Sequence, residues 1–301
     1  MKRRIGLGAV LLGMVLASTF ALHIFAQKPE GGDGEFLKFL SRTSIFSWEQ
    51  EYMETEYEPQ LELAMTSLGI ETVYQEVSDG TDPKIVLSYL ERRADKGQKV
   101  FYLAGASEWG LEEDAASMLA EVEKVKKWNR DAIKGRGFAG IVWDVEPYLL
   151  REWRKAPEAS MEQFVQNCEA AYRAAKENRL AVILCIPNFY DLPEYNQGLE
   201  RLVRDGCDGI AVMNYLKQDE AGQIAGEVEL AEKYGKAVIN ITELQKPGYH
   251  ELTEENTYYY DGLEAVTESW EHIRENFSYS GLGFSWHYLK PVLKLMGEET
   301  E

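Results

Sequence analysis

The sequence predicts an α/β fold, a single (β/α)8 TIM barrel, and three observations lead to this fold class. Eight short apolar runs alternate with amphipathic stretches along most of the 301 residues. Strands that alternate with helices favour a parallel sheet, because antiparallel neighbours need no helical crossover. Eight such units fill a length close to the ~250 residues typical of the barrel. A doubly wound open sheet is the competing architecture, but no glycine-rich dinucleotide turn follows the first run.

The predicted strands are short apolar runs of the kind that a fully buried parallel sheet requires. In chain order they span residues 43–48, 71–77, 99–105, 140–147, 181–188, 209–215, 237–243 and 281–288. The amphipathic stretches between them predict helices over residues 49–68, 83–94, 112–134, 160–176, 196–204, 218–234 and 261–276, with a short last helix from Pro291 onward.

The loops distinguish the two ends of the predicted barrel. Several helix-to-strand joins are short and contain a glycine, at Gly69, Gly97, Gly206 and Gly235. Two strand-to-helix joins, 148–159 and 244–260, are much longer. The longer loops therefore lie on the face where the strands end, which is the face on which barrel enzymes carry their chemistry.

The N-terminal segment predicts export. Lys2-Arg3-Arg4 precedes an apolar run over residues 5–26, which is long enough to cross a bilayer and has a poor cleavage pattern. We expect residues 1–26 to be a signal peptide or membrane anchor, residues 27–36 a tether, and residues 37–301 the barrel. The basic flank places the barrel outside the cytoplasm. Membrane contact is expected only through residues 5–26.

Charge and the scarce metal ligands exclude several function classes. Without residues 1–26, which contain three basic and no acidic residues, 29 basic face 51 acidic residues, a formal charge of −22. Nucleic acid is therefore an improbable partner. The cysteines fall in predicted helix, strand and pre-strand positions and are expected to be buried and unpaired: Cys168, Cys185 and Cys207. The histidines have no ligand spacing, so no metal or cofactor is expected.

Two carboxylates of the same parity end the fourth predicted strand, Asp144 and Glu146. Residues two apart on a strand point to one face. In a closed barrel both would face the interior at the mouth, which is typical of a hydrolase site.

The segment 138–147 that carries these acids is similar to the fourth-strand motif of family 18 glycoside hydrolases, the chitinase-like barrels. That motif has four acidic residues ending in Asp-x-Glu; here Ala139 and Val142 stand at the first two positions. Met213-Asn214-Tyr215 resembles the family's sixth-strand Met-x-Tyr motif, with Leu216 in place of an aspartate. Trp286 stands where the family commonly has a tryptophan at the floor of the sugar site.

The resemblance implies a substrate-assisted mechanism. Glu146 would protonate the glycosidic oxygen, and the acetamido group of the sugar would attack the anomeric carbon. Asp144 would orient and stabilise that group, Tyr215 would donate a hydrogen bond to it beside Met213, and Trp286 would stack beneath the ring. An acid that works at neutral pH needs its pKa raised by an apolar or anionic setting, and Asp144 supplies an anionic neighbour for Glu146.

Other residues near the strand ends are candidates for a substrate site. Asn188, Glu243 and Glu76 are polar candidates to compensate for the missing acids, although each also has a purely structural interpretation as a cap, a loop start or a helix contact. Trp48 and Trp109 are possible sugar platforms, and Tyr148 and Tyr190 also border the mouth. Large aromatic residues serve equally well as packing under loops.

These observations predict an exported glycoside hydrolase that acts on a carbohydrate polymer or oligosaccharide with N-acetyl groups, chitin-like or peptidoglycan. Three alternatives stay open: a family 25 lysozyme-like hydrolase, a barrel that binds glycans without cleaving them, and a scaffold protein of the cell envelope with a plugged mouth. The sequence does not indicate an oligomeric state.

Overall fold

The computed structural model describes residues 33–298, and in them eight parallel strands form a closed barrel. Each strand pairs with the next in the chain, and β8 closes the barrel against β1. The strands are β1 (Ser44–Ser47), β2 (Thr72–Glu76), β3 (Lys99–Ala104), β4 (Gly140–Trp143), β5 (Ala181–Pro187), β6 (Gly209–Met213), β7 (Ala237–Glu243) and β8 (Leu282–His287). Each lies within its predicted run, so the predicted fold class is confirmed.

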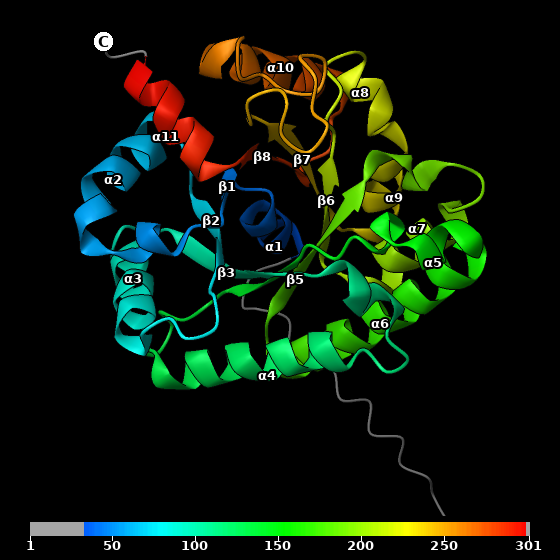
Figure 1. The fold of residues 1–301 in the computed structure, drawn as a ribbon, viewed down its shortest axis with the longest axis horizontal. Coiled ribbons are helices and arrows are strands. Elements are labelled where there is room, and N and C mark those ends of the chain that lie inside the picture. The colour runs from blue at the N-terminus through cyan, green and yellow to red at the C-terminus, as the bar shows by residue number, and fades with distance from the viewer. Residues whose placement is uncertain (1–32, 299–301) are drawn as a thin grey trace, which may run out of the picture.

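Helices surround the strands on all sides (Figure 1). The helices of the described residues are α1 (Asp33–Leu40), which lies at the centre, and α2 (Glu58–Ser67), α3 (Pro83–Asp95), α4 (Ala116–Asp131), α5 (Arg151–Lys155), α6 (Pro157–Glu177), α7 (Asn196–Arg201), α8 (Glu220–Gln223), α9 (Ala225–Tyr234), α10 (Gly262–Asn276) and α11 (Leu289–Glu298). None of the helices in residues 33–298 is long and apolar enough to cross a membrane.

Alternation along the strands divides the apolar residues into two cores. Residues of one parity fill the barrel, among them Phe46, Phe101 and Val142. Residues of the other parity, such as Ile141 and Trp143, pack against the helices. Because both faces of a barrel strand are buried, the strands appear in the sequence as nearly continuous apolar runs.

Helix α1 closes the bottom of the barrel, and the sequence did not predict it. Phe36, Phe39 and Leu40 pack against the inner core, and the Phe39 ring lies 5.9 Å from that of Phe101. Figure 1 shows α1 at the centre of the ring of strands. Residues 33–36, expected in the tether, thus begin this helix. The predicted signal or anchor and residues 27–32 of the tether lie outside the described residues.

The predicted helix over residues 49–68 is interrupted. Two 3-10 turns, η1 (Gln50–Met53) and η2 (Thr55–Tyr57), precede α2, and Glu54 between them is extended, with φ −76° and ψ 152°. Pro59 in the first turn of α2 is typical of a helix start, because proline cannot donate the hydrogen bond that a helix interior requires. The helix therefore begins only at Glu58.

Candidate active site

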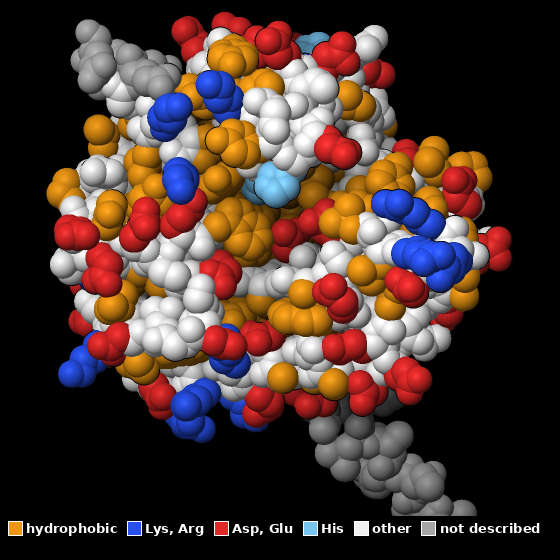
Figure 2. Space-filling view, in the orientation of Figure 1, with side chains coloured by type: hydrophobic (Ala, Val, Ile, Leu, Met, Phe, Trp, Pro, Cys, Tyr) orange, Lys and Arg blue, Asp and Glu red, His pale blue; other side chains and the backbone are white. Residues whose placement is uncertain are grey.

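The mouth of the barrel holds a cavity of about 850 Å³. In Figure 2 it appears as a hollow near the centre of this face, with acidic side chains and a histidine beside hydrophobic ones. Strand ends and the loops that follow them line it: Phe46, Trp48, Asp144, Glu146, Tyr148, Leu149, Cys185, Pro187, Asn188, Phe189, Met213, Tyr215, Leu216, Ile241, Glu243, Gln245, His250, Glu251, Leu252, Asn256, His287 and Tyr288. A cavity of this size is typical of a small-molecule or oligosaccharide site.

Asp144 and Glu146 both line this cavity, as the parity of the strand indicates. Strand β4 ends at Trp143, earlier than expected, but the Asp144 amide continues its ladder by donating to the Ala104 carbonyl at 3.0 Å. Glu146 lies just before a 3-10 turn, η4 (Pro147–Leu149). The two carboxylates therefore share one space although the strand is short.

Gly105 makes the position of Asp144 possible. A Cβ atom added at Gly105 would lie 1.8 Å from the Asp144 carbonyl oxygen and 2.9 Å from its Cα atom. No side chain fits in that space. The end of β3 is thus shaped for the close approach of the backbone that carries the first carboxylate.

The Asp144 carboxyl has a pKa raised to about 7. Burial is the largest cause, and the charge of Glu146 adds to it, whereas the charge of His287 and a hydrogen bond with Cys185 act in the opposite direction. Asp144 can therefore exchange a proton near neutral pH.

Glu146 is held by its near neighbour Tyr148, whose hydroxyl donates a hydrogen bond to the carboxylate. The Tyr148 ring packs edge-on against Phe189 at 5.3 Å and Tyr190 at 6.2 Å. Burial, followed by the charge of Glu146, raises the pKa of the Tyr148 phenol, so Tyr148 remains a donor at physiological pH. Tyr148 therefore orients the carboxylate proposed as the acid.

Tyr215 and Met213 reach the cavity from β6 and its end. The Tyr215 carbonyl accepts a hydrogen bond of 2.8 Å from Asn256, which fixes the backbone. Its phenol has no hydrogen-bond partner in residues 33–298, and burial raises its pKa. A neutral hydroxyl with a free donor thus faces the same space as Asp144.

Two of the three polar residues considered as compensating groups line the cavity. Asn188 donates a 2.7 Å hydrogen bond to Gln223, and Glu243 is nearly fully buried. Glu76 does not line it.

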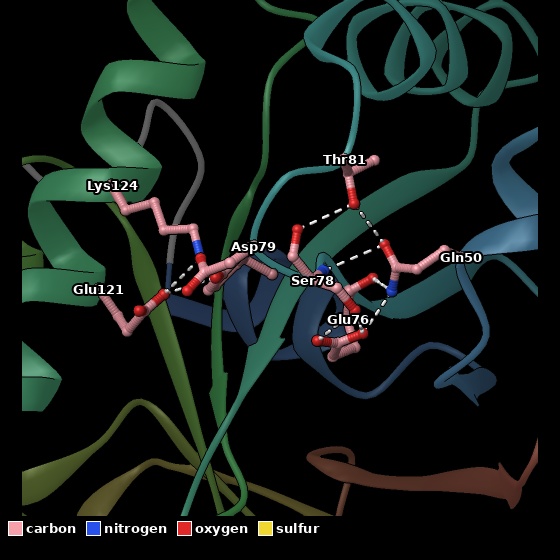
Figure 3. Close-up of polar contacts among 8 residues, drawn as sticks. Gln50, Glu76, Ser78, Asp79, Thr81, Glu121 and Lys124 are labelled. Carbon is pink, nitrogen blue, oxygen red and sulfur yellow. Dashed lines mark hydrogen bonds and ion pairs between the residues drawn. The ribbon is translucent and has the colours of Figure 1, made fainter.

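Glu76 belongs to a separate polar network outside the cavity (Figure 3). Gln50 donates to the Glu76 carbonyl at 2.9 Å and also to its carboxylate, and Ser78 donates to that carboxylate. Nearby, Lys124 binds Asp79 at 2.9 Å. Glu76 therefore joins the loops after β1 and β2 and contributes nothing to the cavity wall.

Among the large aromatic residues considered as sugar platforms, only Trp48 lines the cavity, stacked on Phe46 at 6.2 Å. Trp109 packs against the outer core, and Tyr190 is 1% exposed in an aromatic cluster that includes Trp153. Both were expected at the mouth and lie beneath its loops, because a large ring gains more by burial than by exposure.

Trp286 also lies elsewhere than expected. It is fully buried on the outer side of β8, with its ring 4.5 Å from that of Trp270 on α10. Residues 284 and 286 share one parity and face the helices, whereas Ser285 and His287 face inward. The expected tryptophan floor is therefore incorrect, and His287 occupies the inward position at the end of β8.

The sequence reasoning missed His287 and the cavity role of Cys185. All three cysteines are buried and free, and Cys185 lines the cavity beside Asp144. Strict alternation along β8, with apolar residues at 282, 284 and 286, was the signal that could have placed His287 inside the barrel.

At the level of sequence, no family model and no curated protein matches the chain. Solved structures are similar to it in fold. A GH18 chitinase from Pseudoalteromonas aurantia is 10% identical, with a TM-score of 0.55 over 86% of this chain and 99% of that one. A plant class V chitinase mutant from Cycas revoluta, in complex with (GlcNAc)3, is 13% identical, with a TM-score of 0.56 over 85% and 98%.

A putative α-L-fucosidase from Bacteroides thetaiotaomicron is equally similar: 13% identical, with a TM-score of 0.58 over 86% of this chain and 91% of that one. Identities this low establish a shared fold and leave the reaction to be argued from the site. The chain has a TIM barrel similar in fold to those of these chitinases and of this fucosidase.

Proposed function

We propose that the protein is a glycoside hydrolase that cleaves N-acetylated glycans by acid catalysis with substrate assistance. The observation that carries the proposal is the joint position of Asp144 and Glu146 in one cavity, with the pKa of Asp144 near 7. Tyr215 adds a free hydroxyl to the same space. Similar folds in other glycoside hydrolases support this proposal at the level of architecture.

The chemistry requires one acid and one group that stabilises positive charge. The Glu146 carboxyl gives its proton to the glycosidic oxygen while the bond from that oxygen to the anomeric carbon breaks. The acetamido carbonyl oxygen of the sugar forms a new bond to the anomeric carbon and closes a cationic five-membered ring. Water then attacks the anomeric carbon, opens the ring and returns a proton to the Glu146 carboxylate.

Asp144 would serve this reaction through its charge and its proton. Near pH 7 the buried Asp144 carboxyl holds or releases a proton. Transfer of that proton to Glu146 leaves Asp144 negative beside the acetamido nitrogen, where the cationic ring develops charge. Tyr215 would donate a hydrogen bond to the acetamido group.

The cavity wall suits a neutral sugar ring. Trp48, Phe189 and Tyr288 provide aromatic surface, and within residues 33–298 no lysine or arginine lines the cavity. Aromatic side chains bury the apolar faces of sugars, whereas binding an anionic glycan would require cations. Chitin-like or peptidoglycan chains with uncharged N-acetyl groups are the proposed substrates.

Particular residues favour one alternative and disfavour another. Val142, fully buried below Asp144, leaves no acid there, which is compatible with a barrel that binds glycans without cleaving them. A family 25 lysozyme-like mechanism would need a second available carboxylate. Glu243 is the fully buried acid of the cavity, but His287 and two backbone amides already occupy it.

Release of reducing ends from N-acetylglucosamine oligomers tests the proposal. Because a general acid contributes roughly 10²–10⁴-fold to rate, Glu146→Gln is expected to lose about that factor in turnover. Calorimetric binding of the oligomers should persist, and Glu194→Gln, at an exposed position, serves as the matched control. Binding without turnover by the wild-type protein would favour the glycan-binding alternative.

We also propose that the barrel acts outside the cytoplasm, secreted or held at the membrane. The support is the basic flank and apolar run of residues 2–26. Fractionation of cells that express the full chain tests this location, with a variant lacking residues 1–26 as the control. Recovery of the full chain in the cytoplasmic fraction would contradict it.

A further inference from the structure

A buried pair of residues in the cavity has no role in the mechanism described above. His287 Nδ1 lies 2.8 Å from Glu243 Oε2, and the Glu243 side chain is only 2% exposed. The other Glu243 oxygen accepts hydrogen bonds from the amides of Leu244 at 2.8 Å and Gln245 at 2.6 Å. Glu243 is thus a rigid anchor, fixed by the backbone that follows β7.

The surroundings of His287 fix the imidazole ring as well. Its ring lies 5.3 Å from the Phe46 ring, edge-on, and 5.8 Å from the Tyr215 ring. The bond to Glu243 uses Nδ1 as a donor, and Nε2 has no hydrogen-bond partner in residues 33–298. One ring nitrogen is therefore committed to the anchor, and the tautomer is defined by that bond.

Several titratable groups from different elements line the cavity with His287. Glu243 ends β7, Asp144 and Glu146 follow β4, Tyr215 follows β6, Cys185 lies on β5, Tyr288 follows β8, and His250 and Glu251 lie in the loop after β7. Burial disfavours the charged imidazole, but Glu243 and then the other two carboxylates outweigh it and raise the pKa of His287. Burial likewise opposes the Glu243 charge, and His287 lowers the pKa of Glu243 overall.

The charge of His287 acts on Asp144 across the mouth of the barrel, where it lowers the pKa that burial and Glu146 raise. Strand β4, which carries Asp144, provides no side chain that could stabilise the Asp144 carboxylate from below, because Val142 occupies that inward position. No lysine or arginine among residues 33–298 lines the cavity, and His287 is the cavity residue whose positive charge lowers the pKa of Asp144.

We propose that His287, anchored by Glu243, is a positioning residue for Asp144: its imidazolium stabilises the Asp144 carboxylate when the proton of the acid pair moves to Glu146. The pair would thereby supply from β7 and β8 the support that Val142 does not give from β4. The role in catalysis rests on the proposed function, whereas the electrostatic pairing itself does not.

A titration that needs no turnover tests the pairing. Carbon-13 NMR of the full chain, labelled at aspartate carboxyl and histidine ring carbons, follows both groups against pH, and the signals are assigned with Asp144→Asn and His287→Gln. Loss of a nearby opposite charge typically moves a carboxyl pKa by about 1–3 units. The Asp144 midpoint is therefore expected to rise by about one unit or more in His287→Gln.

Glu243→Gln is a second variant, which weakens the positive charge at His287 without removing the imidazole. The midpoint of His287 is expected to fall and that of Asp144 to rise. His272→Gln, at an exposed position on α10, is the matched control, in which the Asp144 midpoint should stay as in the wild type. An Asp144 midpoint that is equal in His287→Gln, Glu243→Gln and His272→Gln would overturn the proposal.

Kinetics then separate this inference from the proposed function. If the enzyme hydrolyses oligomers, the high-pH limb of the kcat/KM profile should shift to higher pH in His287→Gln. The value of kcat should fall, with a smaller change in KM. Absence of turnover in the wild type would contradict the hydrolase proposal without affecting the titrations. Turnover with an unmoved Asp144 midpoint would contradict the positioning role alone.

Discussion

At the scale of single residues, the site depends on a glycine as much as on its acids. Gly105 directly follows β3 and Asp144 directly follows β4, and their backbones approach more closely than a Cβ atom allows. The Asp144 carboxylate can therefore project into the cavity only because position 105 has no side chain.

Gly105→Ala is expected to displace Asp144 and to lower kcat/KM for oligomer hydrolysis by about 10²-fold, the effect of a misplacement of roughly 1 Å. It should also cost about 1–3 kcal/mol in unfolding free energy, because the new methyl group has no space. Gly34→Ala on α1, where no atom lies within 4 Å, is the control. Equal activity in the two variants would contradict this account of Gly105.

The sequence could predict Asp144, Glu146 and Tyr215 because each lies in a local pattern of strand parity and motif. His287 and Glu243 meet only through the pairing of β7 with β8, which places residue 243 beside residue 287. No spacing along the chain encodes that contact. Trp286 was misplaced because a motif position was preferred over the alternation of β8.

At the scale of elements, the strands were predictable and the irregular segments were not. An apolar run between a glycine-marked turn and a polar loop leaves few interpretations, and Gly69 and Gly235 indeed adopt φ near +60°. Helix α1 was not predicted because its amphipathic pattern covers only eight residues and directly follows a glycine-rich stretch. Its partner is the inner core at the bottom of the barrel, which lies far along the chain.

Leu40→Ala tests the role of α1 as a plug. Leu40 is 2% exposed against the inner core, so truncation is expected to cost about 2–5 kcal/mol in urea unfolding. Hydrolysis at a temperature where the variant is folded should be unchanged, because α1 lies at the end opposite the cavity. Leu63→Ala on α2, where the leucine is 57% exposed, should cost at most about 0.5 kcal/mol. A similar cost for both would mean that α1 does not close the barrel.

At the scale of the whole molecule, a strongly acidic protein presents an acidic cavity. The formal net charge is −19, and four carboxylates line the cavity, three of which raise the pKa of His287. This field repels anionic glycans and attracts cationic ones. Electrostatic attraction alone would therefore favour a deacetylated, cationic oligosaccharide, whereas the proposed chemistry requires the acetamido group.

These two demands make one measurement decisive: the initial rate of hydrolysis of an N-acetylglucosamine oligomer compared with that of the fully deacetylated oligomer of equal length. Because the cationic oligomer should still bind the acidic cavity, a difference in cleavage reports the missing nucleophile rather than missing affinity. We expect the acetylated oligomer to be cleaved and the deacetylated one to bind without cleavage. Comparable cleavage of both, or cleavage of neither, would contradict substrate-assisted hydrolysis by Asp144 and Glu146.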